Sequence, residues 1–223
     1  MAHNTFSLLF VLFAALLAVA NGSAVREVQR RDENFPARVP YMFPAPGTNA
    51  IADAIRARRG NGTLLALDGA LLNSPLVAQG WNQFFTVIRE NLTIPGDMRE
   101  LFILRTAVLN NAAYQWGQHE SVGRAEGLTT RQLTVVRFAA EGACSLADQK
   151  ILGDSLAAAL DFADAIGTSV YVPTHIYDNL ARFLSPQQMV EAVATAGSYA
   201  FVSRFTVSLN VNGQMNAEVP VPM

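Results

Sequence analysis

Residues 99–129 read RELFILRTAVLNNAAYQWGQHESVGRAEGLT, two apolar helical stretches that meet at the pair Asn110-Asn111. Paired asparagines tolerate a left-handed backbone and cap helices with their side chains, so one helix can end and the next begin there. Gln115 and His119 are four residues apart on the second stretch and therefore share one face. If the two helices fold back as a hairpin, Glu100 on the first stretch comes close to His119.

A helical pattern continues over most of the remaining chain. No alternating strand pattern and no hairpin turn signature interrupts it, so the sequence predicts an all-α fold. Ser74-Pro75 is a helix start, Gly127 is a stop, and Thr129 with Gln132 forms a capping box. The expected helices cover 48–59, 63–72, 74–91, 97–110, 112–126, 130–141, 146–166, 173–183 and 186–209.

The N-terminal residues indicate export from the cell. The apolar run Phe6–Ala20 is shorter than the about 20 residues that span a bilayer, and it ends in a small-x-small cleavage pattern. Residues 1–20 are therefore predicted to be a signal peptide of a secreted protein, with a signal anchor as the alternative. Asn61 and Asn91 begin Asn-x-Thr triplets, which are acceptors for N-glycosylation in that compartment.

Composition and helix-breaking residues divide the chain after the signal peptide into three segments. Residues 21–47 form a proline-spaced extended arm, 48–212 a single helical domain, and 213–223 an extended tail. The pair Arg30-Arg31 in the arm is either a processing site or part of a solvated linker.

Composition also excludes several classes of function. The chain is 51% hydrophobic and 15% charged, which supplies ample core, and its formal charge of −2 leaves no basic surface for nucleic acid. Cys144 is the only cysteine, so no intrachain disulfide can form, and we expect it to pack as a small apolar side chain. No cluster of cysteines and histidines has the spacing of zinc ligands. Stability is expected to come from packing helped by oligomerisation.

The stretch 99–129 resembles the carboxymuconolactone decarboxylase and alkylhydroperoxidase-D superfamily. Its redox members carry a glutamate, eleven residues, Cys-x-x-Cys, three residues and a histidine. Glu100 and His119 match the outer positions, whereas Ala112 and Gln115 stand at the two cysteine positions. The resemblance extends through LLNSPLVAQGWNQFFTVIRENLTIPGDMRE upstream and FLSPQQMVEAVATAGSYAFVSRFTVSLNV downstream. It implies an alkylhydroperoxidase-D-like (AhpD-like) helical domain that assembles as a homotrimer or a higher homo-oligomer.

The departures from the family pattern limit the chemistry. Peroxide reduction in the redox members needs a thiolate and a resolving thiol, and Ala112 and Gln115 supply neither. Decarboxylase-like members carry a glutamate at the second cysteine position, within AYEW. Gln115, in AYQW, cannot ionise, which puts an acid–base role at that position in doubt.

The residues that remain suit proton transfer without a cofactor or a metal. Loss of carbon dioxide from a conjugated lactone leaves an oxyanion that the protein must stabilise, followed by protonation of carbon. His119 is predicted to donate this proton, Glu100 to orient the imidazole, and Gln115 to donate its amide to the oxyanion.

A carboxylate-bearing substrate also needs a cation, for which Arg105 and Arg204 are the candidates. Tyr114 and Tyr199 are expected to line the substrate cavity. His175 either lines the same cavity or lies on the surface.

Each of these residues also has a purely structural interpretation. Glu100 could cap its own helix together with Asp97, His119 could be a hydrogen-bonded core histidine, and Arg204 could pair with an internal acid. Tyr114 and Trp116 could pack in the core or at a subunit interface. Two functions follow: a secreted, cofactor-independent enzyme that decarboxylates or moves protons on a small unsaturated carboxylic acid or lactone, or a catalytically silent binder or oligomeric scaffold.

Overall fold

The computed structural model describes residues 37–60, 62–142 and 144–223, and this part of the chain is all-α, with no β-strand. The predicted fold class is therefore confirmed. The helices are α2 (Ala50–Arg59), α3 (Ala66–Leu71), α4 (Pro75–Glu90), α5 (Gly96–Leu109), α6 (Ala113–Ala125), α7 (Thr130–Phe138), α8 (Leu146–Leu152), α9 (Asp154–Thr168), α10 (Thr174–Ala181), α11 (Pro186–Ser208) and the short 3-10 turn η1 (Val211–Gly213). The predicted signal peptide, the pair Arg30-Arg31 and Asn61 lie outside the described residues.

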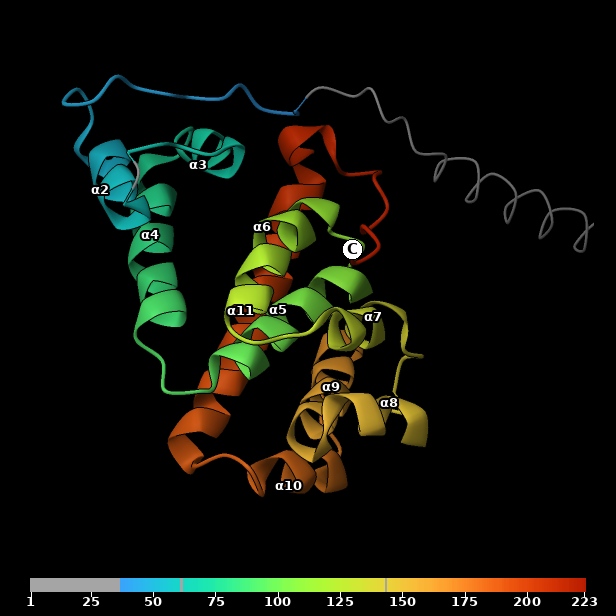
Figure 1. The fold of residues 1–223 in the computed structure, drawn as a ribbon. Helices are drawn as coiled ribbons and strands as arrows, with labels where there is room; N and C mark the ends of the chain where they lie inside the picture. The colour runs from blue at the N-terminus through green and yellow to red at the C-terminus, as the bar shows by residue number, and fades with distance from the viewer. Residues whose placement is uncertain (1–36, 61, 143) are drawn as a thin grey trace, which may run out of the picture. The chain divides into compact units, whose positions relative to one another are not determined.

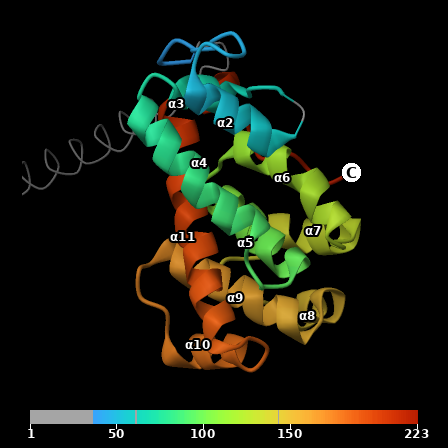
Figure 2. The same cartoon turned by 90° about the vertical axis from the view of Figure 1, so that its left-hand side faces the viewer.

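The hairpin of α5 and α6 is the centre of this helical unit (Figure 1). Asn111 adopts a left-handed φ of 48° at the turn between the two helices, as the paired asparagines predicted. α11 packs along α5 and α6, and α9 packs against α5 from the other side. Figure 2 shows α4 lying alongside α11, so that α2, α3 and α4 cover one flank of the hairpin.

Two clusters of buried apolar side chains meet at α5, which explains why this helix is buried on all sides. Leu101, Phe102 and Leu104 pack toward α7, α9 and α11 in one cluster. Ile103 belongs to the other cluster, which includes Trp81 of α4. Burial of these side chains is the main stabilising contribution to such a fold.

Capping residues set several helix ends as the sequence indicated. Thr129 and Gln132 form the predicted capping box at the start of α7, and Ser185 with Gln188 does the same for α11. The predicted single helix over 146–166 is wrong: the chain forms α8 and α9, separated by Gly153 at φ 79°, ψ 166°. This backbone conformation is accessible essentially to glycine alone, so the helix must break there.

The described part of the arm, residues 37–47, has no helix and lies against the helical unit. The Met42 amide donates to the Gly69 carbonyl at 3.0 Å, and the Arg38 amide donates to the Leu209 carbonyl at 3.0 Å. The arm therefore binds α3 and the end of α11. Among the described residues, no helix is long and apolar enough to cross a membrane.

Candidate active site

Glu100 and His119 form a buried hydrogen-bonded pair at the centre of the hairpin. The distance from His119 Nδ1 to Glu100 Oε2 is 2.8 Å, and the two residues are 8% and 2% exposed. The proximity predicted from their spacing is present in the structure. Glu100 does not cap α5, since this helix begins at Gly96 with no side-chain cap and the carboxylate faces His119.

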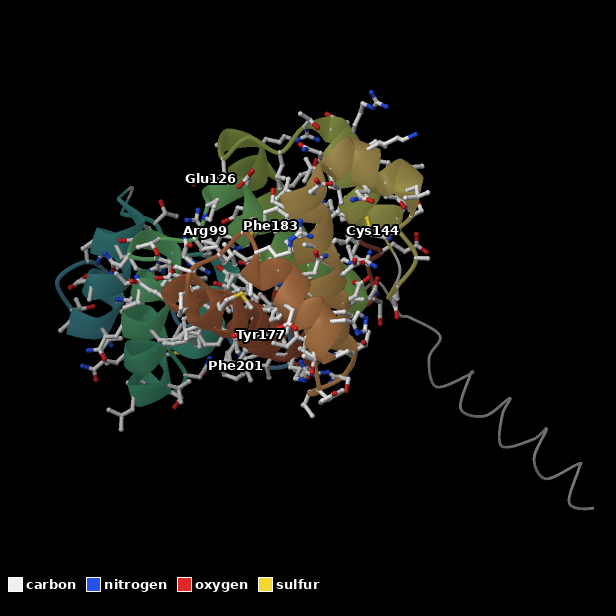
Figure 3. All side chains as sticks on the ribbon, turned by 90° about the horizontal axis from the view of Figure 1, so that it is seen from below. Arg99, Glu126, Cys144, Tyr177, Phe183 and Phe201 are labelled. Atoms are coloured by element: carbon white, nitrogen blue, oxygen red, sulfur yellow. The ribbon has the colours of Figure 1, made fainter. Side chains whose placement is uncertain are left out.

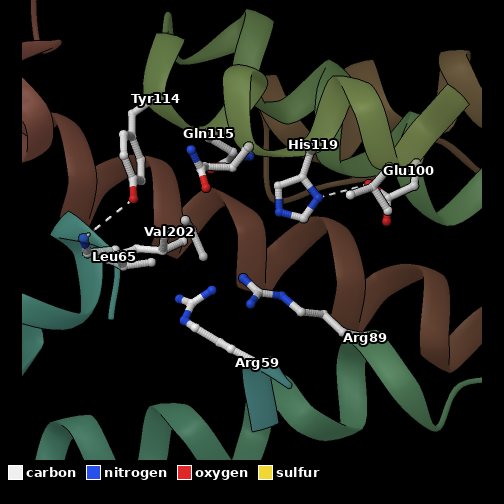
Figure 4. Close-up of a pocket in the computed structure, with 11 residues that line it drawn as sticks. Arg59, Leu65, Arg89, Glu100, Tyr114, Gln115, His119 and Val202 are labelled. Atoms are coloured by element: carbon white, nitrogen blue, oxygen red, sulfur yellow. Dashed lines mark hydrogen bonds and ion pairs between the residues drawn. The ribbon is translucent and has the colours of Figure 1, made fainter. Parts of the chain in front are cut away.

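The environment of His119 favours its neutral form. Burial lowers the pKa of His119 below the usual 6.5, and the nearby charges of Arg89 and Arg99 act in the same direction, against the raising effect of Glu100. Because a carboxylate accepts at Nδ1, that nitrogen carries the proton and Nε2 keeps its lone pair. Figure 4 shows the second ring nitrogen of His119 turned toward the pocket. The neutral imidazole can therefore accept a proton at Nε2, and the predicted donation of a proton to carbon stays a prediction.

A pocket of about 200 Å³ opens in front of this imidazole. One wall comes from the hairpin and carries Glu100, Tyr114, Gln115, Gln118, His119 and Val122. The opposite wall comes from the N-terminal helices and the segment before α3, and carries Arg59, Leu65, Leu67 and Arg89, while Val202 of α11 completes the lining. The pocket thus lies between the hairpin and the flank formed by α2, α3 and α4 (Figure 4).

Two arginines of this opposite wall were not identified from the sequence. Arg59 Nε and Nη2 donate to the Asp68 carboxylate at 2.6 and 2.8 Å. Arg89 Nε donates to the Tyr199 hydroxyl at 2.8 Å, and in the described part of the chain no carboxylate pairs with Arg89. Both lie on amphipathic helices outside the stretch 99–129, where their sequence context does not distinguish them from surface arginines.

Tyr114 and Tyr199 occupy different positions relative to the pocket. Tyr114 lines it, and its hydroxyl accepts a hydrogen bond from the Leu67 amide at 3.4 Å. Tyr199 is fully buried behind the lining, with its ring edge-to-face on His119 at 4.9 Å between centroids. Burial raises the pKa of both phenols, so both stay protonated at neutral pH. The Tyr114 hydroxyl therefore keeps a proton with which it can donate.

Gln115 lines the pocket, but its amide is oriented by the protein. Gln115 Nε2 donates to the Ile103 carbonyl at 2.9 Å, and Gln115 Oε1 accepts from the Ser203 hydroxyl at 3.0 Å. Because a carbonyl can only accept, this pair of partners sets which end of the amide is the nitrogen. One N–H of Gln115 Nε2 is thus used by Ile103, and donation of the second N–H to a substrate oxyanion stays a prediction.

The two arginines predicted to bind substrate do not reach the pocket. Arg105 is 1% exposed and forms a bidentate ion pair with Asp164 at 2.5 and 3.0 Å, so its role is structural. Arg204 is exposed and donates to the Ala200 carbonyl of its own helix. Arg204 therefore does not line this pocket, and no acid among the described residues forms an ion pair with it.

The other aromatic and sulfur side chains lie outside the pocket. Trp116 is fully buried and its Nε1 donates to Glu120 at 2.8 Å, as its structural interpretation predicted, and His175 is exposed at the start of α10. Figure 3 shows Cys144 well away from the ion pair of Arg99 with Glu126, which joins the outer ends of the hairpin. Burial raises the pKa of the Cys144 thiol to about 11, which disfavours the reactive thiolate.

Metal-ligating side chains do not cluster in the part of the chain that the structure describes. No group of three or more histidine, cysteine, aspartate or glutamate residues in it could hold a metal ion. The side chains of the pocket are a histidine–glutamate pair, a phenol, two guanidinium groups, the amides of Gln115 and Gln118, and apolar groups. This set can bind a small polar ligand, and its imidazole and phenol can exchange protons.

Comparisons with known proteins identify the fold. No protein-family model matches the chain, and no curated protein matches it. Among solved structures it is similar to the debrominase Bmp8. A cysteine-to-alanine variant of Bmp8 in complex with 2,3,4-tribromopyrrole aligns with a TM-score of 0.63 and 16% identity, over 81% of this chain and 92% of that chain. Apo Bmp8 aligns with a TM-score of 0.62 and 15% identity, over 78% and 90%. The expected AhpD-like helical fold is thereby confirmed.

Proposed function

We propose that the protein is a cofactor-independent enzyme that moves a proton on a small unsaturated carboxylic acid or lactone. The observation that carries this proposal is the geometry of the His119 imidazole, with Nδ1 hydrogen-bonded to Glu100 and Nε2 directed into the pocket. A base whose orientation is held by a buried carboxylate is a recurrent arrangement for general acid–base catalysis. Because the imidazolium that forms would remain hydrogen-bonded to Glu100, the pair stabilises the charge created by proton transfer.

The simplest reaction is an isomerisation. His119 Nε2 takes a proton from a carbon next to a conjugated carbonyl group, and the electron pair of the C–H bond moves to the carbonyl oxygen. The Tyr114 hydroxyl donates a hydrogen bond to the resulting oxyanion. The His119 imidazolium then returns the proton to another carbon of the conjugated system, so that atoms and charge balance without a second substrate.

Decarboxylation uses the same groups in a different order. The bond between the carboxylate and the ring breaks, carbon dioxide leaves, and the electron pair moves into the conjugated carbonyl. His119 then protonates carbon, which requires that it first take a proton from water, since its resting form is neutral. Each turnover therefore consumes one proton, and decarboxylation should slow as the pH rises.

The structural neighbour supports a small unsaturated ring as the ligand. The Bmp8 complex contains 2,3,4-tribromopyrrole, so a protein of this fold binds one substituted five-membered ring. The alternative function, a catalytically silent small-molecule binder or oligomeric scaffold, is supported by the amide of Gln115, whose two ends are bound by Ile103 and Ser203.

The compartment and assembly belong to the same proposal. Residues 1–20 act as a signal peptide, the protein is secreted, and Asn91 carries a glycan. Asn91 is exposed at the end of α4, where an oligosaccharide has room. A homotrimer or a higher homo-oligomer is the proposed assembly.

Turnover of the secreted protein, purified from the medium of a secreting host, tests the proposal. A panel of muconolactone-type acids and lactones is followed for carbon dioxide release, for loss of ultraviolet absorbance, and for proton exchange by NMR in deuterium oxide. We expect turnover or exchange that is lost in His119→Ala and kept in Arg204→Gln, an exposed control. Full activity of folded His119→Ala would contradict the proposal. Binding without turnover or exchange would favour the silent binder.

A further inference from the structure

We propose that Arg59 and Arg89 form an anion subsite that binds the carboxylate of a flat, single-ring acid. This inference deepens the proposed function and rests on it, because the same pocket contains the His119 base. It assigns the cationic anchor to the wall formed by α2 and α4 and defines the class of ligand.

The first step is the charge balance of this wall. Arg58, Arg59 and Arg89 lie close enough that the charges of Arg89 and Arg59 lower the pKa of Arg58, after the larger effect of burial. Two carboxylates, Asp68 and Glu90, raise the pKa of Arg58, and Asp68 forms its ion pair with Arg59. Positive charge is therefore in excess on one side of the pocket, and a bound anion would relieve the repulsion.

The second step is the orientation of Arg89. Its Nε donates to the Tyr199 hydroxyl, and its guanidinium carbon lies 5.3 Å from the centre of the Phe85 ring and 5.8 Å from that of Tyr199. These contacts hold the guanidinium in place and leave its two terminal nitrogens for a ligand. Because Tyr199 stays protonated, it does not neutralise the charge of Arg89. A guanidinium held in this way suits bidentate binding of a carboxylate.

The third step is the orientation of Arg59. Asp68 accepts from Arg59 Nε and Nη2, and one oxygen of Asp68 also accepts from the Leu65 amide at 2.8 Å. These bonds leave both N–H groups of Arg59 Nη1 and one of Nη2 as donors. Figure 4 shows the guanidinium groups of Arg59 and Arg89 directed toward each other across the pocket from Tyr114 and Gln115. The two arginines can thus bind one anion between them.

The remaining lining defines the body of the ligand. Leu65, Leu67 and Val202 supply apolar contacts near Tyr114, whereas the carboxylate of Glu100 is hydrogen-bonded to His119 on the far side. Pockets for drug-sized ligands enclose about 300–1,000 Å³, and this pocket of about 200 Å³ is smaller. A single ring fits this volume, with its carboxylate at the arginines and a ring carbon at His119 Nε2.

Binding of a matched pair of probes tests the subsite on the full chain. The probes are 2-furoate and its neutral isostere 2-furamide, titrated by calorimetry at pH 7 and low ionic strength. We expect 2-furoate to bind about tenfold or more tightly than 2-furamide, as for hydrogen bonds to a charged group. We expect this preference to weaken with added salt, to be lost in Arg89→Gln, and to be kept in Arg89→Lys in reduced form. Arg204→Gln is the matched control and should bind like the unaltered chain.

The outcomes separate this subsite from the proposed reaction. A preference for the anion that depends on Arg89 and survives His119→Ala supports the subsite, even if no acid of the panel is turned over. Equal binding of the two probes, or a preference that persists in folded Arg89→Gln, overturns it. Turnover of carboxylic acids with a KM that is insensitive to Arg89→Gln would also overturn it, while leaving the reaction of His119 intact.

Discussion

Tyr199 contacts His119 edge-to-face, with ring centroids 4.9 Å apart and planes at 86°, while its hydroxyl accepts a hydrogen bond from Arg89. One buried ring therefore supports both the base and the proposed anion anchor. The base comes from α6 and the anchor from α4, so Tyr199 of α11 connects the two walls of the pocket.

Tyr199→Phe should weaken anion binding and spare the base. The substitution keeps the ring on His119 but removes the acceptor for Arg89 Nε, so the guanidinium loses its fixed orientation. We expect the Kd for 2-furoate to rise about tenfold, the size of one hydrogen bond to a charged group. In the active enzyme KM should rise more than kcat falls. Tyr177→Phe, on the exposed ring of α10 labelled in Figure 3, is the control. An unchanged Kd in Tyr199→Phe would show that Tyr199 does not position Arg89.

His119 should make the free energy of unfolding depend on pH. Its pKa is lowered in the folded protein, whereas the unfolded chain titrates near 6.5. Below pH 6.5 the unfolded state therefore binds a proton that the folded state does not, and stability falls as the pH drops toward the folded pKa. One such group contributes at most about 1.4 kcal/mol per pH unit. Urea unfolding of the native chain and of His119→Gln isolates this contribution, and identical pH slopes would refute it.

Glu100→Gln should shift the titration of His119 in a known direction. The hydrogen bond and the charge of Glu100 both raise the pKa of His119, so removing the charge should lower this pKa further. NMR titration of the ring carbon resonances measures it, with the exposed His175 as an internal reference. A His119 titration that moves to higher pH in the variant would be inconsistent with the pairing described.

Much of the site could be predicted from local sequence, and the remainder depends on tertiary packing. The spacing of Glu100 and His119 across Asn110-Asn111 is a property of two adjacent helices, so the hairpin could be foreseen. Arg89 could not, because nothing in the sequence of α4 shows that its last turn faces α6. The break at Gly153 was missed because a single glycine is compatible with a continuous helix until its φ is known.

The assignment of Arg105 failed for a related reason. A helix that is apolar around its whole circumference has no solvent-facing side, so Arg105 could not be placed from periodicity. Its actual partner, Asp164, lies on α9. Only the packing of α5 against α9 decides that this arginine is structural.

Arg105→Leu should destabilise the fold without altering the pocket. The substitution leaves the buried carboxylate of Asp164 without its cation, and breaking a buried pair in this way costs about 3–5 kcal/mol. The double variant Arg105→Leu with Asp164→Leu should recover a large part of this loss, since no buried charge remains. Chemical denaturation measures both variants, and 2-furoate affinity serves as the control for the pocket. A double variant no more stable than the single one would contradict this account.

Gln115→Glu tests whether this pocket can hold an acid where decarboxylase-like proteins carry one. A carboxylate at this position would face the Ile103 carbonyl, which offers no proton, and Gln115 is only 1% exposed. Burial and this carbonyl should raise the pKa of the new side chain, so that its protonated form donates to Ile103 in place of the amide. The stability of the variant should then be retained below about pH 4.3 and lost as the pH rises through the raised folded pKa. The loss at pH 8 should be on the order of 3 kcal/mol.

Gln115→Met, which also removes the donor but cannot ionise, should lose stability by an amount that does not depend on pH. If Gln115→Glu proves as stable at pH 8 as at pH 4, the carboxylate has found a donor in the pocket. The amide would then not be required by the packing around it, and the main support for the silent binder would be removed.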